Sequence, residues 1–303
     1  MKSVARFNAW AAQAGLHLTA KDVGVVIFAT VTLLVTLVWA AGVTLLTVLA
    51  PITVGLLLSV QLHGVRRILD YQVRSHSHGL EHVTKQLSNE YRQVQSLLSL
   101  FFTLRIAHPL PPLRGWAVSP DFGVLVISNI LHRQPLTILE LGSGVSTLLL
   151  GYCVRQLGRG HVLSVDHLED FAEESRRNIA RHGLEDVVTI VHAPLRQIRL
   201  RGQEFLWYDP ARLPIGPIDC LIVDGPPATT GELARYPAIP LLHSSLSDKA
   251  MILVDDGERD DEQEAIRRWL TEFPWLDAQY VALEKGAFVL HKVWRAEQAR
   301  SVA

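Results

Sequence analysis

Residues 138–147 read Ile-Leu-Glu-Leu-Gly-Ser-Gly-Val-Ser-Thr, and this stretch decides the fold. An apolar run ends at Leu141, the glycines Gly142 and Gly144 flank one serine, and an apolar helical pattern then begins. The stretch therefore predicts a strand, a tight turn and the start of a helix. Glycine permits positive φ and close approach of a ligand, while free N–H groups at a helix start favour an anionic group. We therefore expect a cofactor at this turn.

Strand-like and helix-like patterns alternate from about residue 113 onward. Such alternation predicts an α/β fold, with a parallel sheet covered by helices on both faces. Ligands of such sheets bind beyond the carboxyl ends of the strands. The expected strands are 136–141, 161–166, 187–192, 218–224, 250–255, 278–283 and 286–291, and the expected helices are 119–132, 144–157, 169–183, 229–245 and 260–273.

Polar and acidic residues stand where the expected strands end. Glu140 and the glycine turn close the first strand, and Asp166 closes the second. An acid in the position of Asp166 can accept two hydrogen bonds from ribose hydroxyls. The later strand ends carry His192-Ala193-Pro194, Asp224 and Asp255-Asp256. Because the carboxyl ends of parallel strands share one edge, we expect these residues at one rim.

The glycine turn lacks the third glycine of a dinucleotide fingerprint, since Thr147 stands there. The pattern from Glu140 to Gly144 instead resembles the first motif of class I S-adenosylmethionine-dependent methyltransferases, and the resemblance covers about residues 115–292. It implies a Rossmann-like seven-stranded sheet whose last strand is antiparallel. It also implies S-adenosylmethionine as cofactor, with the 142–144 loop on the methionine part, Asp166 on the ribose and residues 192–195 beside the adenine.

The sequence departs from that family after the third strand, where many members hold the adenine amino group with an acidic or polar residue. Here the chain reads His192-Ala193-Pro194-Leu195. The cofactor-binding residues expected from the motif and the strand ends are Glu140, Gly142, Ser143, Gly144, Ser146, Thr147, Asp166, His167, Ala193 and Asp224.

The acids after the fourth and fifth strands are the candidates for catalysis. Methyl transfer needs an aligned nucleophile that often loses a proton, so Asp224 and Asp255 are the expected catalytic residues. Together with Asp256 they offer oxygen ligands suited to Mg²⁺ or Ca²⁺. This placement resembles the metal site of catechol-type O-methyltransferases, although Asp256 replaces an asparagine and Pro227 replaces the catalytic lysine of that family. Alternatively, Asp224 acts alone, and Asp255 and Asp256 cap the next helix.

No Asp, Glu, Lys or Arg occurs from Val23 to Val65. One helix of that length would span about 65 Å, roughly twice the hydrocarbon core of a bilayer. Two transmembrane helices, at about 22–40 and 43–62, fit better, so we expect a membrane hairpin over 23–63 after a cytoplasmic segment 1–22. Basic residues flank both ends, which predicts that both termini face the cytoplasm. A buried core hairpin is the alternative interpretation.

Residues 64–108 are expected to form a helical connector before the domain 109–303, because a seven-residue apolar repeat runs through 64–105 and prolines follow at 109, 111 and 112. Such a repeat indicates a coiled coil, and with it a possible homodimer. The alternative is a helix packed on its own domain. The repeat positions are Val73, Leu80, Leu87, Val94 and Phe101, with Leu69, Val83, Leu97 and Leu104 on a second seam.

Composition narrows the choice of partner. The net charge of −1 and the lack of a basic stripe argue against nucleic-acid binding. Two isolated cysteines, Cys153 and Cys220, suit a reducing compartment.

The expected function is a membrane-anchored S-adenosylmethionine-dependent methyltransferase, O-directed, acting on a small-molecule or lipid- or glycan-linked acceptor. The alternatives are a non-catalytic adenosine-ligand-binding domain of a membrane scaffold and a nicotinamide-dependent oxidoreductase.

Overall fold

The computed structural model describes residues 20–41, 43–213 and 216–293, without the side chains of 20–23, 26, 41–48, 68–69 and 72–82. The chain divides into two compact units, residues 1–84 and 85–303. We describe each unit by itself.

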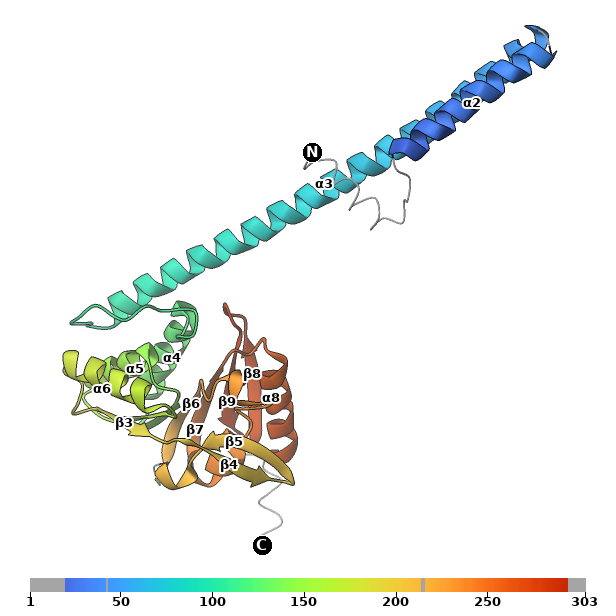
Figure 1. Cartoon of the computed structure of the whole chain (residues 1–303). Coiled ribbons are helices and arrows are strands. Elements are labelled where there is room, and N and C mark those ends of the chain that lie inside the picture. Colours follow the sequence, from blue (N-terminus) through green and yellow to red (C-terminus); the bar gives the residue numbers. More distant parts are fainter. Residues whose placement is uncertain (1–19, 42, 214–215, 294–303) are drawn as a thin grey trace. The chain divides into compact units, whose positions relative to one another are not determined.

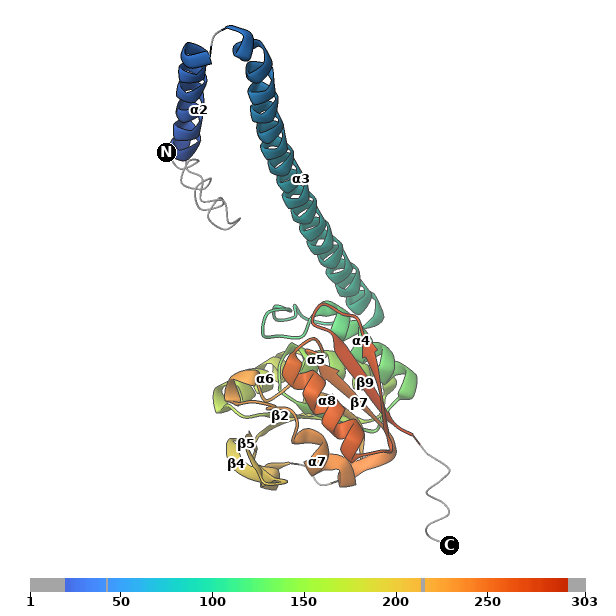
Figure 2. The ribbon, with the colours of Figure 1, turned by 90° about the vertical axis from the view of Figure 1, so that its right-hand side faces the viewer.

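The first unit contains helix α2 (Ala20–Ala41) and the beginning of helix α3 (Val43–Thr103) (Figure 2). The two helices pack together, since side chains from Thr30 to Val38 of α2 and Leu49 and Thr53 of α3 line a common apolar pocket. The second expected transmembrane helix and the expected connector form one continuous helix, with Pro51 inside it.

One helix of the described part meets the requirements of length and apolar composition for a membrane span. Among the described residues, the stretch Leu49–Arg67 is long and apolar enough to cross a bilayer. The apolar stretch Ile27–Ala40 of α2 is shorter, and at 1.5 Å per residue it spans only about 21 Å, less than a hydrocarbon core of about 30 Å. Two transmembrane helices are therefore not supported by the described part of the chain.

The last turns of α3 belong to the second unit. Leu100 and Leu104 are buried in its core, and the side-chain oxygen of Gln93 accepts the backbone N–H of Asp121 at 3.2 Å. The interpretation of a helix packed on its own domain is confirmed here, and the unit begins at residue 85 rather than after the connector. Leu87, Val94 and Phe101 of the first seam are exposed. The homodimer stays a prediction, as do the seam positions whose side chains lie outside the described part.

Truncating Leu100 tests this packing. Its side chain is fully buried, so we expect Leu100→Ala to lower the free energy of unfolding by about 3 kcal/mol, through lost burial and a residual cavity. The matched control is Leu98→Ala, because Leu98 is 51% exposed on the same helix and its loss should cost less than about 0.5 kcal/mol. Urea unfolding, followed by the fluorescence of the buried tryptophans Trp207 and Trp269, makes the measurement. Equal effects of the two variants would contradict the packing.

The second unit is built on a seven-stranded sheet in the order β3-β2-β1-β6-β7-β9-β8 (Figure 1). Only β9 runs antiparallel to its neighbours, which confirms the expected antiparallel last strand. The strands are β1 (Thr137–Leu141), β2 (His161–Asp166), β3 (Val188–His192), β6 (Ile218–Val223), β7 (Leu246–Asp255), β8 (Leu276–Val281) and β9 (Ala287–Lys292).

The sheet separates two apolar cores because successive side chains of a strand point to opposite faces. Ile138 of β1 packs with α4 (Pro120–Arg133), α5 (Val145–Leu157) and α6 (Glu169–Arg181). Its neighbour Leu139 packs on the other face with α7 (Ala238–Leu242) and α8 (Asp260–Glu272). Figure 1 shows α4, α5 and α6 on one side of the sheet and α8 on the other. The three-layer α/β fold is as predicted.

One predicted helix was wrong, and one hairpin was not predicted. The helix expected over 229–245 is reduced to α7, flanked by the single 3₁₀ turns η2 (Ala228–Thr230) and η3 (His243–Ser245). Pro237 and Pro240 within that segment limit a longer helix, because proline lacks the N–H that a helix interior needs. The segment after the third strand folds into an unexpected antiparallel hairpin of β4 (Leu195–Leu200) and β5 (Gln203–Tyr208), which covers the sheet beside α7.

Candidate functional site

The glycine turn meets the ends of two neighbouring strands. The N–H of Gly142 donates to the carbonyl of Val165 at 2.8 Å, and the N–H of Asp224 donates to the carbonyl of Leu141 at 3.0 Å. Gly142 has φ of +104°, and a Cβ there would lie 3.3 Å from the backbone of Asp224. A glycine is therefore required where the turn passes the end of β6.

Asp166 at the end of β2 is tied to the same turn. Its Oδ2 accepts hydrogen bonds from the backbone N–H of Ser143 at 3.3 Å and from the Ser143 hydroxyl at 2.8 Å. Its Oδ1 accepts the N–H of Leu168 at 3.0 Å and lies 3.5 Å from Nδ1 of His167. These donors fix the orientation of the carboxylate beside the turn, whose residues Gly142 to Gly144 are partly exposed.

Glu140 lies behind the turn, fully buried. Its Oε2 accepts the hydroxyls of Thr147 at 2.5 Å and Ser164 at 2.6 Å, and Thr147 in turn accepts the N–H of Gly144 at 3.0 Å. Burial raises the pKa of Glu140 to about 6. Glu140 thus joins the start of α5 to the sheet. Ser146 and Thr147 are buried with it, so the proposed contacts of these three residues with a cofactor stay predictions.

The buried carboxyl of Glu140 predicts a pH dependence of stability. Because the pKa is raised to about 6 in the folded protein, its contribution is most favourable below pH 4.5 and is lost as pH rises through 6. We expect Glu140→Gln to remove this loss. The difference in unfolding free energy between wild type and variant should change by about 2 kcal/mol from pH 4 to pH 7. Urea unfolding across that range checks it, and a pH-independent difference would contradict the assignment.

The end of β3 lies next to Asp166. The N–H of Ala193 donates to the carbonyl of Asp166 at 2.8 Å, and Ala193 is fully buried. His192 is partly exposed and contacts Glu169 of α6. The structure therefore brings the expected adenine segment to the side of the ribose-binding candidate, with Ala193 contributing backbone rather than an accessible side chain.

Tyr208, at the end of β5, was not among the expected site residues. Its side chain is fully buried, and among the described residues its hydroxyl has no hydrogen-bond partner. A Cβ on Gly225 would lie 2.3 Å from that hydroxyl, so Tyr208 reaches the segment directly after Asp224. Burial raises its pKa, so the phenol is neutral. The sequence offered one signal, the aromatic pair Trp207-Tyr208 before Asp209. The carboxylate of Asp209 accepts the N–H of Ala211 in the turn that follows.

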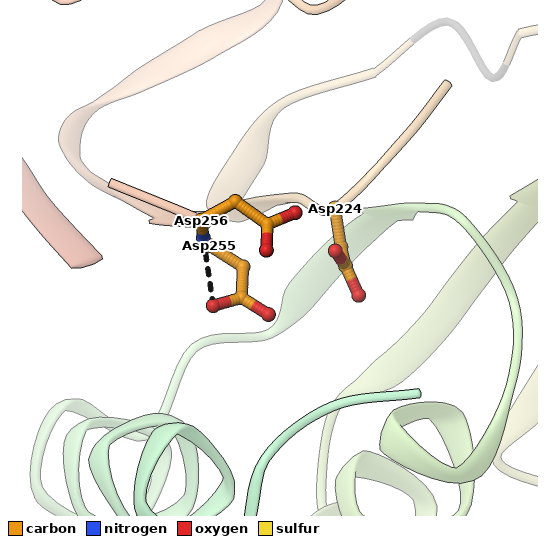
Figure 3. A group of neighbouring side chains, drawn as sticks. All are labelled: Asp224, Asp255 and Asp256. Carbon is orange, nitrogen blue, oxygen red and sulfur yellow. Dashed lines mark hydrogen bonds between the residues drawn. The ribbon is translucent and has the colours of Figure 1, made fainter. Parts of the chain in front are cut away.

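The acids after β6 and β7 converge as predicted. One carboxylate oxygen from each of Asp224, Asp255 and Asp256 lies within 4.8 Å of the others, and Figure 3 shows the three side chains gathered together. Oδ1 of Asp255 accepts the N–H of Asp256 at 2.8 Å. Burial raises the pKa of Asp224 to about 6 and that of Asp255 further above its ordinary value. By distance alone these oxygens could hold a cation.

Arg235 enters the same cluster and was missed by the sequence analysis. Its buried guanidinium donates to the carboxylate of Asp256 at 2.7 Å and lies 3.3 Å from that of Asp224. Arg235 lies in the segment that was expected to be helical. In such a segment an arginine is typical of the solvent-exposed face of the helix. Its position could not be inferred from the pattern of neighbouring residues.

A family model described as "Methyltransferase domain" matches residues 139–257, from the second residue of the glycine-turn motif to the residue after the acid pair. Residues 139–257 are therefore similar to a methyltransferase domain. The rim described above is the part of this matched region where β1, β2, β6 and β7 end. Of the expected site residues, it gathers Gly142, Ser143, Gly144, Asp166, His167, Asp224, Asp255 and Asp256.

Two curated proteins are similar to parts of the chain. An O-methyltransferase named hkm8, from Aspergillus hancockii, is 30% identical over 145 residues, which are 46% of this chain and 50% of that protein. Protein-L-isoaspartate O-methyltransferase 1 from a Polaromonas species is 35% identical over 82 residues, 26% of this chain and 33% of its own length. The chain thus spans half or less of the length of these relatives.

Solved structures are also similar to parts of the chain. An O-methyltransferase from Bacillus cereus in complex with SAH has 18% identity and a TM-score of 0.46, covering 68% of this chain and 97% of that one. The O-methyltransferase TomG from Streptomyces achromogenes, in complex with SAM, has 16% identity and a TM-score of 0.44, covering 60% and 84%.

Proposed function

We propose that this protein is an S-adenosylmethionine-dependent methyltransferase that acts on an oxygen nucleophile. The observation that carries the proposal is the pairing of the Gly142–Gly144 turn with Asp166 on adjacent strand ends, inside the region that matches a methyltransferase domain. The same rim holds carboxylates that can accept a proton from an acceptor.

The residues present fit this cofactor. The turn at Gly142 brings backbone close to the rim without a side chain, and the start of α5 offers N–H groups to a carboxylate. Asp166 is oriented by Ser143 and supplies acceptor oxygens for ribose hydroxyls. When bound, S-adenosylmethionine would supply an electrophilic methyl group, which would pass to an in-line nucleophile as its bond to sulfur breaks, with S-adenosylhomocysteine as the leaving group.

Asp224 is the proposed general base. It stands at the end of β6, directly beside the glycine turn, and its pKa of about 6 suits proton acceptance near neutral pH. Arg235 lies 3.3 Å from its Oδ1 and holds the carboxylate in place. A carboxylate in this position suits an acceptor hydroxyl, and both curated relatives bear the name O-methyltransferase.

An assay of cofactor turnover tests the activity. The full chain is incubated with S-adenosylmethionine and a panel of phenols, sugar hydroxyls and carboxylic acids, and S-adenosylhomocysteine release is measured. The proposal expects acceptor-dependent release with at least one oxygen nucleophile. If release occurs only with amine or thiol acceptors added in parallel, the O-directed part of the proposal is wrong.

We also propose that the first unit anchors the protein in a lipid bilayer through the stretch Leu49–Arg67. Large apolar side chains of this unit are exposed in the described part, among them Phe28, Trp39 and Leu56. Hydroxyls that would otherwise be costly in lipid are satisfied within the helices, since Thr53 donates to the carbonyl of Leu49 at 3.0 Å. The anchor supports an acceptor that is membrane-associated.

Membrane fractionation tests the anchor. The full chain should remain in membranes after alkaline carbonate extraction. The double variant Leu56→Arg/Leu58→Arg should be released, because each central arginine costs about 3 kcal/mol. Leu87→Arg, which places the same charge on an exposed residue beyond the stretch, is the matched control and should stay bound. Complete extraction of the wild-type chain would refute the anchor.

A further inference from the structure

A buried arginine stands among the carboxylates that were expected to hold a metal. Arg235 is 4% exposed. Its Nη1 donates to the carbonyl of Asp255 at 2.9 Å, and its Nη2 donates to the carboxylate of Asp256 at 2.7 Å and to the carbonyl of Asp224 at 3.1 Å. The same Nη2 lies 3.3 Å from the Asp224 carboxylate. One guanidinium therefore contacts all three residues of the acidic cluster.

Further charges complete this arrangement. Glu262 of α8 lies 3.4 Å from Nε of Arg235, Arg259 contacts Asp256 at 2.9 Å, and Nζ of Lys285 lies 3.9 Å from the other Asp256 oxygen. Four carboxylates are thus set against three cationic groups. A buried charge is tolerated when it is paired and hydrogen-bonded. Protein groups supply most of these partners, whereas Nε of Arg235, Oδ2 of Asp255 and Oε2 of Glu262 make no hydrogen bond among the described residues.

A divalent cation does not fit this donor set. Mg²⁺ and Ca²⁺ take six or more oxygen ligands, and they need carboxylate oxygens that are not held by other cations. Oδ2 of Asp256 is shared by Arg235 and Arg259, and Oδ1 of Asp224 faces Arg235. Oδ1 of Asp255 accepts a backbone N–H, which leaves its Oδ2 as the oxygen without a hydrogen-bond partner among the described residues. Coordination by all three acids would therefore place a divalent cation directly beside the buried charge of Arg235 and near Lys285.

We propose that Arg235 is the resident cation of this site, so that the three aspartates form no divalent-metal site and methyl transfer proceeds without a metal. Arg235 is then a positioning residue, which sets the orientation of Asp224 and Asp256 through its two Nη groups. Arginine suits this role because its fork of donors is rigid and it stays charged at every relevant pH. Only the statement about methyl transfer rests on the proposed function.

The proposal can be tested without any cofactor. Electron paramagnetic resonance measures how much Mn²⁺ the full chain binds in mild detergent. Wild type should show no site below millimolar Mn²⁺. Arg235→Met keeps the length of the side chain but removes the charge, and it should lower the dissociation constant for Mn²⁺ by about tenfold or more. Arg235→Met/Asp256→Asn should lose the gained site, and Arg235→Lys, which keeps a cation, should resemble wild type.

Two results would overturn the proposal: micromolar Mn²⁺ binding by wild type that is lost in Asp256→Asn, or a folded Arg235→Met protein that gains no site. Should Arg235→Met not fold by thermal melting, the wild-type and Asp256→Asn titrations still decide. S-adenosylhomocysteine release should be unchanged by EDTA. If the protein does not bind S-adenosylmethionine, the proposed function is wrong. The Mn²⁺ titrations would still test whether Arg235 excludes a divalent cation from the three aspartates.

Discussion

Replacing Asp166 with alanine is expected to raise the dissociation constant for S-adenosylmethionine by about 100-fold. The carboxylate stands at the end of β2, held by the N–H and hydroxyl of Ser143 on the glycine turn. Two hydrogen bonds from ribose hydroxyls to a charged acceptor are each worth about 1.5–3 kcal/mol, and the substitution removes both. Isothermal titration calorimetry on the full chain gives the constant.

The matched control for this prediction is Asp170→Ala. Asp170 is an exposed carboxylate four residues further along the chain, in the first turn of α6. It should bind the cofactor within about twofold of wild type, because surface substitutions away from a site change little. Similar losses in both variants would show that the effect of Asp166→Ala is not a loss of ribose contacts.

The second large effect is expected at Asp224. Asp224→Asn keeps the size of the side chain and an acceptor oxygen for Arg235 but cannot take a proton. We expect kcat to fall about 100- to 1000-fold, the contribution of a well-placed general base. The dissociation constant for S-adenosylmethionine should change by less than about fivefold, since the backbone of Asp224, which meets Gly142, is unaltered.

The assignment of Asp224 as general base also predicts how the activity depends on pH. A base must be deprotonated to act, and burial raises the pKa of Asp224 to about 6. The wild-type kcat/KM should therefore fall as pH decreases through 6 and level off above it, whereas the residual activity of Asp224→Asn should lack that limb. Asp248→Asn, an exposed carboxylate at the start of β7, should keep the wild-type profile. An unchanged profile in Asp224→Asn would remove Asp224 from the role of base.

The sequence predicted the sheet and the rim because their signals are local. The central strands are continuous apolar runs, and each ends at a residue that breaks the run, such as Gly142, Asp166 or Asp224. The order of a doubly wound sheet then places these ends at one edge without further information. The antiparallel last strand was implied by the resemblance to the methyltransferase family, and the closing pair of strand patterns was consistent with it.

The features that were missed depend on tertiary contacts. The strands β4 and β5 are short, and their alternation resembles a polar insertion, so the hairpin that buries Trp207 and Tyr208 gave no distinct pattern. Arg235 is one of two charged residues in its segment, with Glu232, and only the folded chain brings its guanidinium to acids twenty residues away. The seven-residue repeat of α3 did not reveal the face that packs on the domain, because Gln93 and Leu100, which contact the domain, lie outside both seams.

Calorimetric titration of the full chain with S-adenosylmethionine, and separately with NAD, measures which cofactor the protein binds. We expect micromolar binding of S-adenosylmethionine with one site per chain, no measurable binding of NAD, and the same result with and without Mg²⁺. A protein shown to be folded by its cooperative thermal unfolding that binds NAD, or that binds no S-adenosylmethionine, would contradict this expectation.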